Sequence, residues 1–476
     1  MLAGGLIIAL FMASQFAAPD PAPAARTTRS LTQFDQFKSI PIGLCEDYPP
    51  ESTSPQRIRR DMALLRSLGV THLRVSFGWD DLEPVDDRFD WSFADEFVRI
   101  AVDECGITLL PYVCYTPAWA ADSQAGAADA WRAPPARRGE FAEVMFHLVN
   151  RYKDRIHTWE LWNEPDNRDY WTGTPGQYAA LLREGAAAVR AADPSAKVVL
   201  GGLAWNLDFL RELFEDYDAQ RDVDIINLHN YAETWFAKPI ESISDYLDAA
   251  SDIAKEHGEG EPLWMAEMGY SSLRHGARVS DWHAAAYEYE HTQKFQAAAL
   301  IRMLTLTLAS PDVQLIAWYE LSDLPHDGEV IGDDNNRHLG ILTHDGDAKP
   351  ALHAMHLAAR MFSKPMRCID DQTEVNRTAG SHSHVHVFER ADGSAAIIAW
   401  LSTMHDDRPH HQAGTAADDR FETIDVKIND RQLTAIQSHD EHGNPMVLPP
   451  IERRDGATHV QRLQLRGGSV TIIELR

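Results

Sequence analysis

Apolar residues recur along the chain in two alternating patterns from about residue 39 onward. Short, almost continuously apolar runs predict β-strands, and each is followed by a segment with the i, i+3, i+4 spacing of an amphipathic helix. Strands are predicted at residues 40–44, 71–77, 107–113, 156–162, 197–201, 223–228, 263–266 and 313–319. Helices are predicted at residues 57–68, 93–104, 141–152, 175–192, 207–217, 243–257, 283–309 and 350–362.

This alternation predicts an α/β fold with a parallel sheet, because a parallel crossover needs a connection of helix length. The strands are apolar on both faces, which is typical of a sheet covered on both sides. Eight strand–helix units favour a closed (β/α)₈ TIM barrel. The rival is an open doubly wound sheet, which would carry a Gly-rich phosphate turn after its first strand. The chain has an acidic, Pro-containing segment there, residues 45–50.

The pattern changes after Phe362, where long helical periods stop. Short strands separated by Gly and Asp turns are predicted at residues 384–389, 395–401, 423–428, 461–465 and 470–475. They indicate a small C-terminal β-sandwich. We therefore expect three parts: an N-terminal segment over residues 1–30, a catalytic barrel over 35–365 and an accessory β-sandwich domain over 366–476.

The N-terminal segment has an apolar run over residues 2–13, followed by small residues and a Pro/Ala stretch. This pattern is typical of a secretory signal peptide, although no Lys or Arg precedes the run. An uncleaved N-terminal membrane anchor fits the same pattern, and the run is too short for a confident membrane span. We expect a secreted or periplasmic protein with no further membrane-spanning segment.

The charge of the chain disfavours one class of partner, nucleic acids. The 476 residues include 44 basic and 72 acidic ones, for a formal net charge of −28. Such a surface repels phosphate backbones, so a nucleic-acid partner is not expected, whereas neutral sugars are not repelled. The 4 cysteines form no CxxC pair and are expected to be free thiols without a metal.

Two glutamates carry the candidate chemistry. Glu164 follows an apolar strand in Trp-Asn-Glu-Pro, and Glu267 ends another in Trp-Met-Ala-Glu-Met-Gly. Reactive side chains of a TIM barrel lie at the carboxyl ends of its strands, so closure of the barrel can bring these two together. A protonated and an ionised carboxyl group are the minimum needed to cut a glycosidic bond. We expect Glu164, between Trp162 and Pro165, to be desolvated and to act as the acid/base, and Glu267 to act as the nucleophile.

The segment from Trp162 to Pro165 resembles the Asn-Glu-Pro signature of the large clan of (β/α)₈ glycoside hydrolases with two catalytic glutamates. The residues that follow, up to Gly202, resemble glycoside hydrolase family 39 most closely. The resemblance covers most of residues 40–365. It implies a retaining hydrolase that cleaves a β-linked oligo- or polysaccharide, with no cofactor and no metal.

The resemblance also implies roles for further residues. Asn163 would hydrogen-bond the sugar 2-OH, Arg74 would keep the nucleophile ionised, and Tyr231 would hydrogen-bond Glu267. His229 matches the His of the clan's His-x-Tyr motif, and Trp318 matches an aromatic platform on the eighth strand. Each has a structural alternative as an ion-paired or core residue. Glu160, within the fourth predicted strand, is interpreted as a structural ion-pair partner, with Arg74 as its candidate cation.

Other features leave alternatives open. A non-catalytic carbohydrate-binding protein on a degenerate barrel and a transglycosylase both share this pattern, and the sugar and the endo or exo mode of action are undetermined. The loop over residues 322–338 is expected to border the cleft. His382, His384 and His386 alternate along a predicted strand, and a polar outer face is favoured over a metal site.

Overall fold

The structure is a computed structural model, and it describes residues 37–122, 126, 128–328, 330–403 and 416–476. The N-terminal segment predicted as a signal or anchor therefore lies outside the described residues.

Eight parallel strands of the described chain form a barrel in the order β5-β4-β3-β2-β1-β8-β7-β6. They are β1 (Ile42–Cys45), β2 (His72–Gly78), β3 (Thr108–Cys114), β4 (Thr158–Asn163), β5 (Lys197–Gly202), β6 (Ile226–Asn230), β7 (Leu263–Met268) and β8 (Val313–Tyr319).

The barrel is completed between β5 and β6 by isolated parallel bridges rather than by a continuous ladder. Leu203 pairs with Leu228 there. The backbone N–H of His229 donates to the carbonyl of Leu203 over 2.8 Å. The fold class is thus confirmed as a TIM barrel followed by a β-sandwich. Because the barrel is parallel throughout, all eight carboxyl ends gather at one rim, which is where both candidate glutamates lie.

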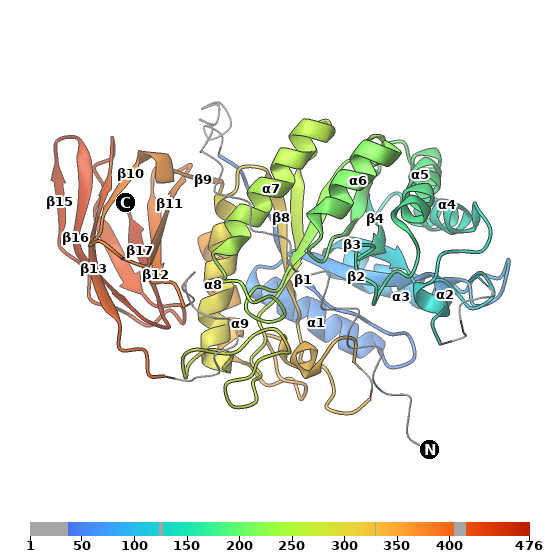
Figure 1. Cartoon of the computed structure of the whole chain (residues 1–476), viewed down its shortest axis with the longest axis horizontal. Helices are drawn as coiled ribbons and strands as arrows, with labels where there is room; N and C mark the ends of the chain where they lie inside the picture. Colours follow the sequence, from blue (N-terminus) through green and yellow to red (C-terminus); the bar gives the residue numbers. More distant parts are fainter. Residues whose placement is uncertain (1–36, 123–125, 127, 329, 404–415) are drawn as a thin grey trace, which may run out of the picture. The chain divides into compact units, whose positions relative to one another are not determined.

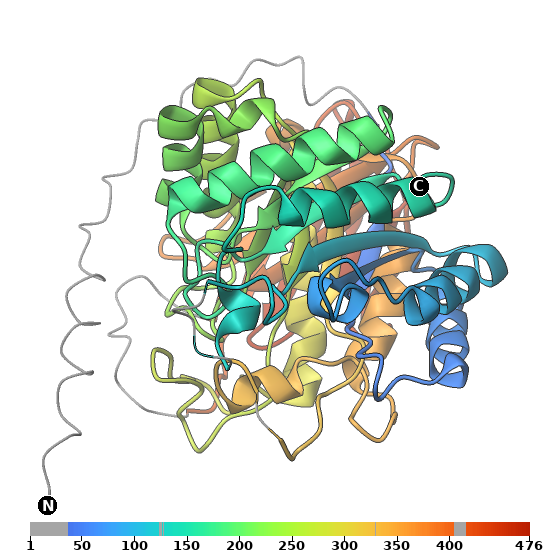
Figure 2. The same ribbon diagram turned by 90° about the vertical axis from the view of Figure 1, so that its right-hand side faces the viewer.

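Helices cover the outside of the strands (Figure 1). They are α1 (Pro55–Leu68), α2 (Trp79–Leu82), α3 (Ser92–Val98), α4 (Glu140–Tyr152), α5 (Pro175–Ala192), α6 (Leu207–Tyr217), α7 (Ser242–His257), α8 (Gln293–Ala309) and α9 (Pro350–Met361). Figure 2 shows α4 and α5 running side by side. α5 begins where its sequence predicts, since Thr174 and Gln177 form a reciprocal capping box and Pro175 needs no amide hydrogen.

Two helix predictions differ from the structure. The helix predicted over 93–104 changes after α3 into a π-helical turn over Arg99–Glu104. The helix predicted over 283–309 is wrong in its first third, since α8 begins only at Gln293. The Thr292 side chain caps α8 by accepting from the Phe295 amide. The carboxylate of Glu290 accepts from amides just before it, which competes with helical pairing.

The C-terminal region forms two antiparallel sheets (Figure 1). The first has the order β10 (Thr373–Asn376), β13 (Phe421–Ile428), β16 (Ala457–Arg466) and β15 (Ile451–Arg454). The second has the order β14 (Ala435–His439), β17 (Val470–Leu475), β12 (Ala395–Leu401), β11 (Ser383–Arg390) and β9 (Met366–Cys368). The sequence pattern missed β9, β10, β14 and β15, which are short edge strands with little buried apolar surface to mark them.

The five-stranded sheet is apolar on both faces. One face packs against the four-stranded sheet through residues such as Val387 and Ile397. The other face, with Phe388, Ile398 and Trp400, belongs to the same hydrophobic core as the barrel. The accessory domain therefore shares a core with the barrel, beside α8. Among the described residues, no helix combines the length and apolar character needed to cross a bilayer.

Candidate active site

Glu164 and Glu267 meet at the carboxyl-terminal rim of the barrel. Glu164 directly follows β4, and Glu267 is the penultimate residue of β7. One carboxylate oxygen of each, together with a ring nitrogen of His229, lie within 4.8 Å of one another. Their side chains keep 8% and 11% of their surface exposed, so both carboxylates remain reachable from solvent. The structure therefore brings the two glutamates close enough to act on one bond.

The carboxyl group of Glu164 has neutral partners. The Asn167 amide donates to Oε2 over 2.8 Å, and Nδ1 of His229 lies 2.9 Å from Oε1. The backbone at Glu164 is left-handed, with φ of 45°, and its N–H donates to the carbonyl of Gly202. Burial raises the pKa of Glu164 to about 7, against the hydrogen bond from Asn167 and the charge of Arg74. The group can thus hold a proton near neutral pH.

The imidazole of His229 is completely buried between the two carboxylates, with Nδ1 also 3.5 Å from Oε1 of Glu267. Burial lowers the pKa of His229 and thus favours the neutral ring. Nε2 has no hydrogen-bond partner among the described residues, which favours a proton on Nδ1. A Cβ at Gly202 would lie 2.0 Å from Nε2, so only glycine leaves space for this ring. Gly202 is a site residue that the sequence alone did not identify.

Glu267 has a cation and a phenol as partners. Nη1 of Arg74 donates to Oε2 over 2.7 Å, and the Tyr231 hydroxyl donates to Oε1 over 2.6 Å. Burial raises the pKa of Glu267, while His229, Arg74 and the Tyr231 hydrogen bond oppose that rise. These donors stabilise the charged form, which is the form that a nucleophile needs.

Arg74 is fixed by a fork of hydrogen bonds from its remaining nitrogens. Nε and Nη2 each donate to Glu160 over 2.8 Å, and Nη2 also donates to Oδ1 of Asn163 over 2.8 Å. The guanidinium lies 4.2 Å from the centre of the Tyr112 ring. Glu160 is therefore the ion-pair partner of Arg74, as the sequence suggested. Because Oδ1 of Asn163 faces Arg74, its NH₂ group is the part of the amide left to donate to a substrate.

Trp318 does not form the predicted sugar platform. Its side chain is 0% exposed and lies in the hydrophobic core. Strand register explains the error: Arg74 and Tyr319 are both paired with Cys45, so they share the inward direction, and Trp318 points the other way. The part-exposed aromatic at this position is Tyr319, whose ring lies 6.3 Å from that of Tyr231. Tyr319 replaces Trp318 as the candidate platform.

More aromatic rings adjoin the two carboxylates. Trp131 contacts Tyr115 at 5.7 Å and Tyr170 at 6.1 Å between ring centres. Burial raises the pKa of Tyr170, and the charges of Glu164 and Glu267 raise it further, which places its hydroxyl near both. No periodicity in the sequence singles out Tyr170, although it follows Glu164 by only six residues. These rings supply apolar surface and hydroxyls of the kind that bind sugars.

The long loop after β8 reaches the same rim, as expected. Oδ1 of Asp333 accepts from Nε1 of Trp235 over 3.1 Å, and the Trp235 ring lies 4.5 Å from that of Tyr231. The segment after the adjacent strand β1 also contributes, since Oδ1 of Asp47 accepts from the Tyr112 hydroxyl over 2.8 Å. Asp47 comes from the acidic segment after β1.

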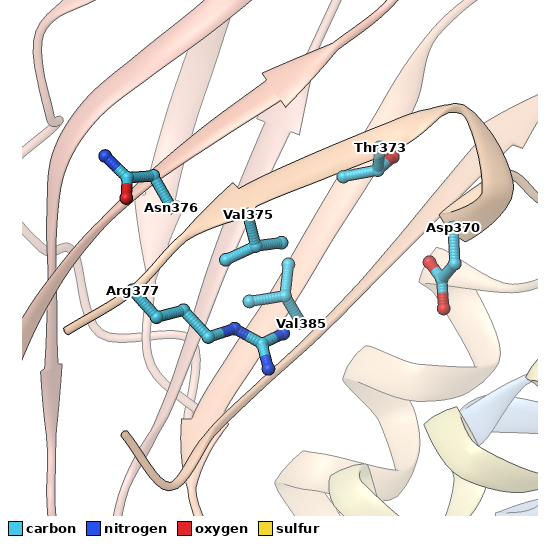
Figure 3. A pocket seen from close by; sticks show the side chains of 6 residues that line it. All are labelled: Asp370, Thr373, Val375, Asn376, Arg377 and Val385. Atoms are coloured by element: carbon cyan, nitrogen blue, oxygen red, sulfur yellow. The ribbon is translucent and has the colours of Figure 1, made fainter. Parts of the chain in front are cut away.

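A separate hollow of about 450 Å³ lies in the C-terminal sandwich (Figure 3). It is lined by Asp370, Thr373, Val375, Asn376, Arg377 and Val385. Asp370 is its one carboxylate, so it lacks the pair that glycosidic cleavage requires. The candidate active site is therefore the barrel rim, where charge, burial and two carboxylates coincide.

The histidines of β11 do not form the polar outer face that the sequence pattern favours, because His384 and His386 are both part-buried. The rings of His384 and His386 both stack on Trp400, at 5.7 and 5.5 Å between centres. Trp400 itself is buried in the core that the sandwich shares with the barrel. Nδ1 of His386 also lies 2.7 Å from Asp370, near Cys368. The alternating histidines thus mark the contact face between the domains, whereas His382 is exposed before the strand begins.

Known proteins resemble this chain. Residues 140–431, more than half of the chain, match the model of the glycosyl hydrolases family 39, and residues 47–191 match a model described as beta-galactosidase. A beta-xylosidase from Caldicellulosiruptor saccharolyticus is 34% identical over 95 residues, which is 19% of this chain and 19% of that protein. The aligned region thus spans about a fifth of this curated relative.

Solved structures share the fold. A family 39 glycoside hydrolase from Bacteroides cellulosilyticus WH2 aligns with a TM-score of 0.64 and 19% identity, over 92% of this chain and 81% of that one. A monomeric beta-xylosidase from Caulobacter crescentus CB15 aligns with a TM-score of 0.60 and 17% identity, over 93% of this chain and 97% of that one. With the match of the family model over more than half of the sequence, the chain belongs to family 39 of the glycosyl hydrolases.

Proposed function

We propose that the protein is a retaining glycoside hydrolase that cleaves a β-linked oligo- or polysaccharide, with Glu267 as nucleophile and Glu164 as acid/base. One observation carries the proposal: oxygens of the two carboxylates lie within 4.8 Å of each other at the barrel rim. Retaining enzymes hold their carboxyl groups about 5–5.5 Å apart, whereas inverting enzymes leave about 6.5–9.5 Å for a water molecule. The short separation favours retention.

The surroundings of the two groups support their assignment. In the first step Glu267 attacks the anomeric carbon while Glu164 gives its proton to the departing glycosidic oxygen. The bond to the leaving group breaks, and a glycosyl ester forms on Glu267. In the second step Glu164, now ionised, takes a proton from water, which attacks the same carbon and releases Glu267. A pKa of about 7 lets Glu164 both give and take that proton near neutral pH.

The chemistry of the rim indicates how the substrate is held. Asn163 is oriented by Arg74 to donate its amide to the sugar 2-OH, and Tyr319 offers a ring face beside the nucleophile. Neither step needs a cofactor, because the two glutamates supply the proton transfer and the covalent bond. β-Xylosides are the first substrates to try, since two of the similar proteins are named beta-xylosidases.

We also propose that the protein is secreted or periplasmic. The support is the apolar run and the small residues that follow it near the N-terminus. Fractionation of expressing cells, with N-terminal sequencing of the recovered protein, distinguishes a cleaved signal from an uncleaved anchor. Recovery of the uncleaved chain from the cytoplasmic fraction alone would refute the proposal.

The direct test of the reaction uses a panel of aryl β-glycosides, with β-xyloside first, followed by proton NMR of the products. We expect the β-anomer of the released sugar to appear before mutarotation, since two displacements restore the configuration. Initial release of the α-anomer contradicts retention. Product sizing on β-linked polysaccharides then distinguishes internal from terminal cutting, and products longer than the substrate would indicate transglycosylation.

A further inference from the structure

The C-terminal sandwich contacts the loop that follows β6 at two points. This β6–α7 loop (residues 231–241) links the rim of the barrel to α7. Just after β12, the Thr403 hydroxyl donates to Oε1 of Glu233 over 2.6 Å, and both residues are 0% exposed. At the far end of the loop, Glu241 accepts from Nε1 of Trp400 over 2.7 Å and from the Ser402 hydroxyl over 3.0 Å. Both contacts place a barrel carboxylate on a donor from the sandwich.

The same loop carries the phenol that contacts the nucleophile. Tyr231 is its first residue, and its hydroxyl donates to Glu267 over 2.6 Å. Two residues on, Glu233 has a left-handed backbone with φ of 63°, and its N–H donates to the carbonyls of Phe236 and Lys238. The turn is therefore closed on Glu233, and a shift of this residue moves the chain that leads to Tyr231. Trp235, packed on the Tyr231 ring, extends that contact.

A second rim loop, between β7 and α8, is held by the sandwich as well. Ala416 forms a parallel bridge opposite Tyr287: its N–H donates to the carbonyl of Ala286, and its carbonyl accepts from the N–H of Glu288. The Tyr289 hydroxyl donates to Asp418 over 2.9 Å. The two loops meet where the Tyr270 hydroxyl donates to Oε2 of Glu233 over 3.3 Å. Glu233 is thus the point where both loops and the sandwich converge.

We propose that the C-terminal sandwich positions the catalytic centre: Thr403, acting through Glu233, holds the β6–α7 loop so that Tyr231 keeps its hydrogen bond to Glu267. Thr403 and Glu233 are positioning residues that touch no substrate. This inference rests on the proposed function, in which Glu267 is the nucleophile. The inference gives the accessory domain a role in catalysis. That role does not involve the hollow in the surface of the sandwich.

The expected signature is a change in the ionisation of the nucleophile. Tyr231 lowers the pKa of Glu267 against the effect of burial. A displaced Tyr231 therefore leaves Glu267 protonated to a higher pH, and the acidic limb of the kcat/KM profile shifts upward. Other titratable or charged groups also face Glu267, and they come from elements that Thr403 does not contact. They are Arg74 on β2, Glu164 and Tyr170 after β4, His229 on β6, Tyr319 on β8 and Cys45 on β1.

The experiment compares Thr403→Val with two controls. Thr403→Ser keeps the hydroxyl, and Thr458→Val removes a different buried hydroxyl, one that donates to the Arg431 carbonyl within the sandwich. Hydrogen–deuterium exchange is followed in peptides covering residues 231–241, and the pH profile of kcat/KM is measured on the best aryl glycoside. Loss of a hydrogen bond to a buried carboxyl group should lower kcat/KM of Thr403→Val by about tenfold at pH 5.

We expect faster exchange in the loop and an upward shift of the acidic limb in Thr403→Val, with Thr403→Ser and Thr458→Val like the wild type. Unchanged exchange in Thr403→Val, or an equal effect of Thr458→Val, overturns the inference. Faster exchange with an unmoved acidic limb overturns it too, since the loop would then be held without positioning Tyr231. If the wild type cleaves no glycoside, the proposed function fails by itself, and the exchange data alone decide whether Thr403 holds the loop.

Discussion

The ends of β4 and β7 present the same functional group in two different environments. At β4, Glu164 is bound by an amide and a neutral imidazole, and burial keeps its pKa near 7. At β7, Glu267 is bound by a guanidinium and a phenol, both of which favour its ionised form. The difference shows how one fold obtains an acid and a nucleophile from identical side chains: the partners of each carboxyl group decide which form is stable, and these partners come from β2, β6 and the loops after β4 and β6.

The largest effect should follow removal of the nucleophile. Glu267→Gln keeps the size of the side chain and the bond to Tyr231 but offers no carboxylate to attack the anomeric carbon. We expect kcat to fall by about 10⁴-fold or more, as for other covalent nucleophiles. Stopped assays that measure the release of the aryl alcohol from an aryl β-glycoside give the fall in kcat. Turnover close to that of the wild type would show that Glu267 is not the nucleophile.

Removal of the acid should cost less, and the loss should depend on the leaving group. Glu164→Ala is expected to slow cleavage of an alkyl glycoside by about 10²–10⁴-fold, the range for general acid catalysis. An activated aryl glycoside should suffer less, because its leaving group needs no proton. Azide should then restore turnover by attacking the glycosyl ester, with a β-glycosyl azide as product. If the turnover of Glu164→Ala depended neither on the leaving group nor on azide, Glu164 would not be the acid/base. The contrast between Glu164 and Glu267 would then be wrong.

The pH dependence of the wild type sharpens the same contrast. Because the pKa of Glu164 is raised to about 7, its acid form is lost as the pH rises through that value. We expect kcat/KM for an alkyl glycoside to fall about tenfold per pH unit above this midpoint. A plateau extending to pH 9 would mean that Glu164 is not the proton donor.

Removal of the phenol tests the partners of Glu267. Tyr231→Phe keeps the ring packed on Trp235 but deletes the donor to Oε1. Loss of this charged hydrogen bond should lower kcat/KM by about tenfold or more and move the acidic limb to higher pH. An unchanged acidic limb of the kcat/KM profile would show that Arg74, without Tyr231, keeps Glu267 ionised.

The last effect concerns stability rather than catalysis. The folded state raises the pKa of Glu164 from the ordinary 4.5 to about 7, so it favours the neutral form. That contribution to stability is complete below pH 4.5 and is lost as the pH rises through 7, by about 3 kcal/mol at most. Glu164→Gln stays neutral throughout. In thermal unfolding, the Tm of Glu164→Gln relative to that of the wild type should therefore rise between pH 5 and pH 8. A difference in Tm that stays constant over this range would place Glu164 in a solvated site.

Much of the fold is predictable because it follows local pattern. Apolar strands and capped amphipathic helices alternate, and α5 starts and stops where its capping residues and periodicity indicate. The failures have local causes that pattern analysis overlooks. The segment before α8 is apolar enough to suggest a helix, but Glu290 binds the amides of Ala286 and Tyr287 instead. Short edge strands such as β15 bury too little to be recognised.

The site is predictable only as far as its motifs extend. The strand pattern predicts Glu164 and Glu267, and the resemblance adds Arg74 and Tyr231. The structure brings the two glutamates within 4.8 Å and places Arg74 and Tyr231 on Glu267, while their catalytic roles stay predictions. Trp318 was chosen over Tyr319 because strand register, which decides the inward face, is not visible in a single strand. Contacts between distant segments also leave no local trace. The bond from Thr403 to Glu233 joins residues 170 positions apart.

The account depends most on Glu267 forming a bond to the sugar while Glu164 stays free. An activated 2-deoxy-2-fluoro β-glycoside of the sugar that the enzyme cleaves slows the second step and traps that bond, and peptide mass spectrometry then locates it. The account predicts one added glycosyl mass, on the peptide that carries Glu267 and on that residue. A label on Glu164, or steady release of product with the inverted configuration and no label, would contradict it.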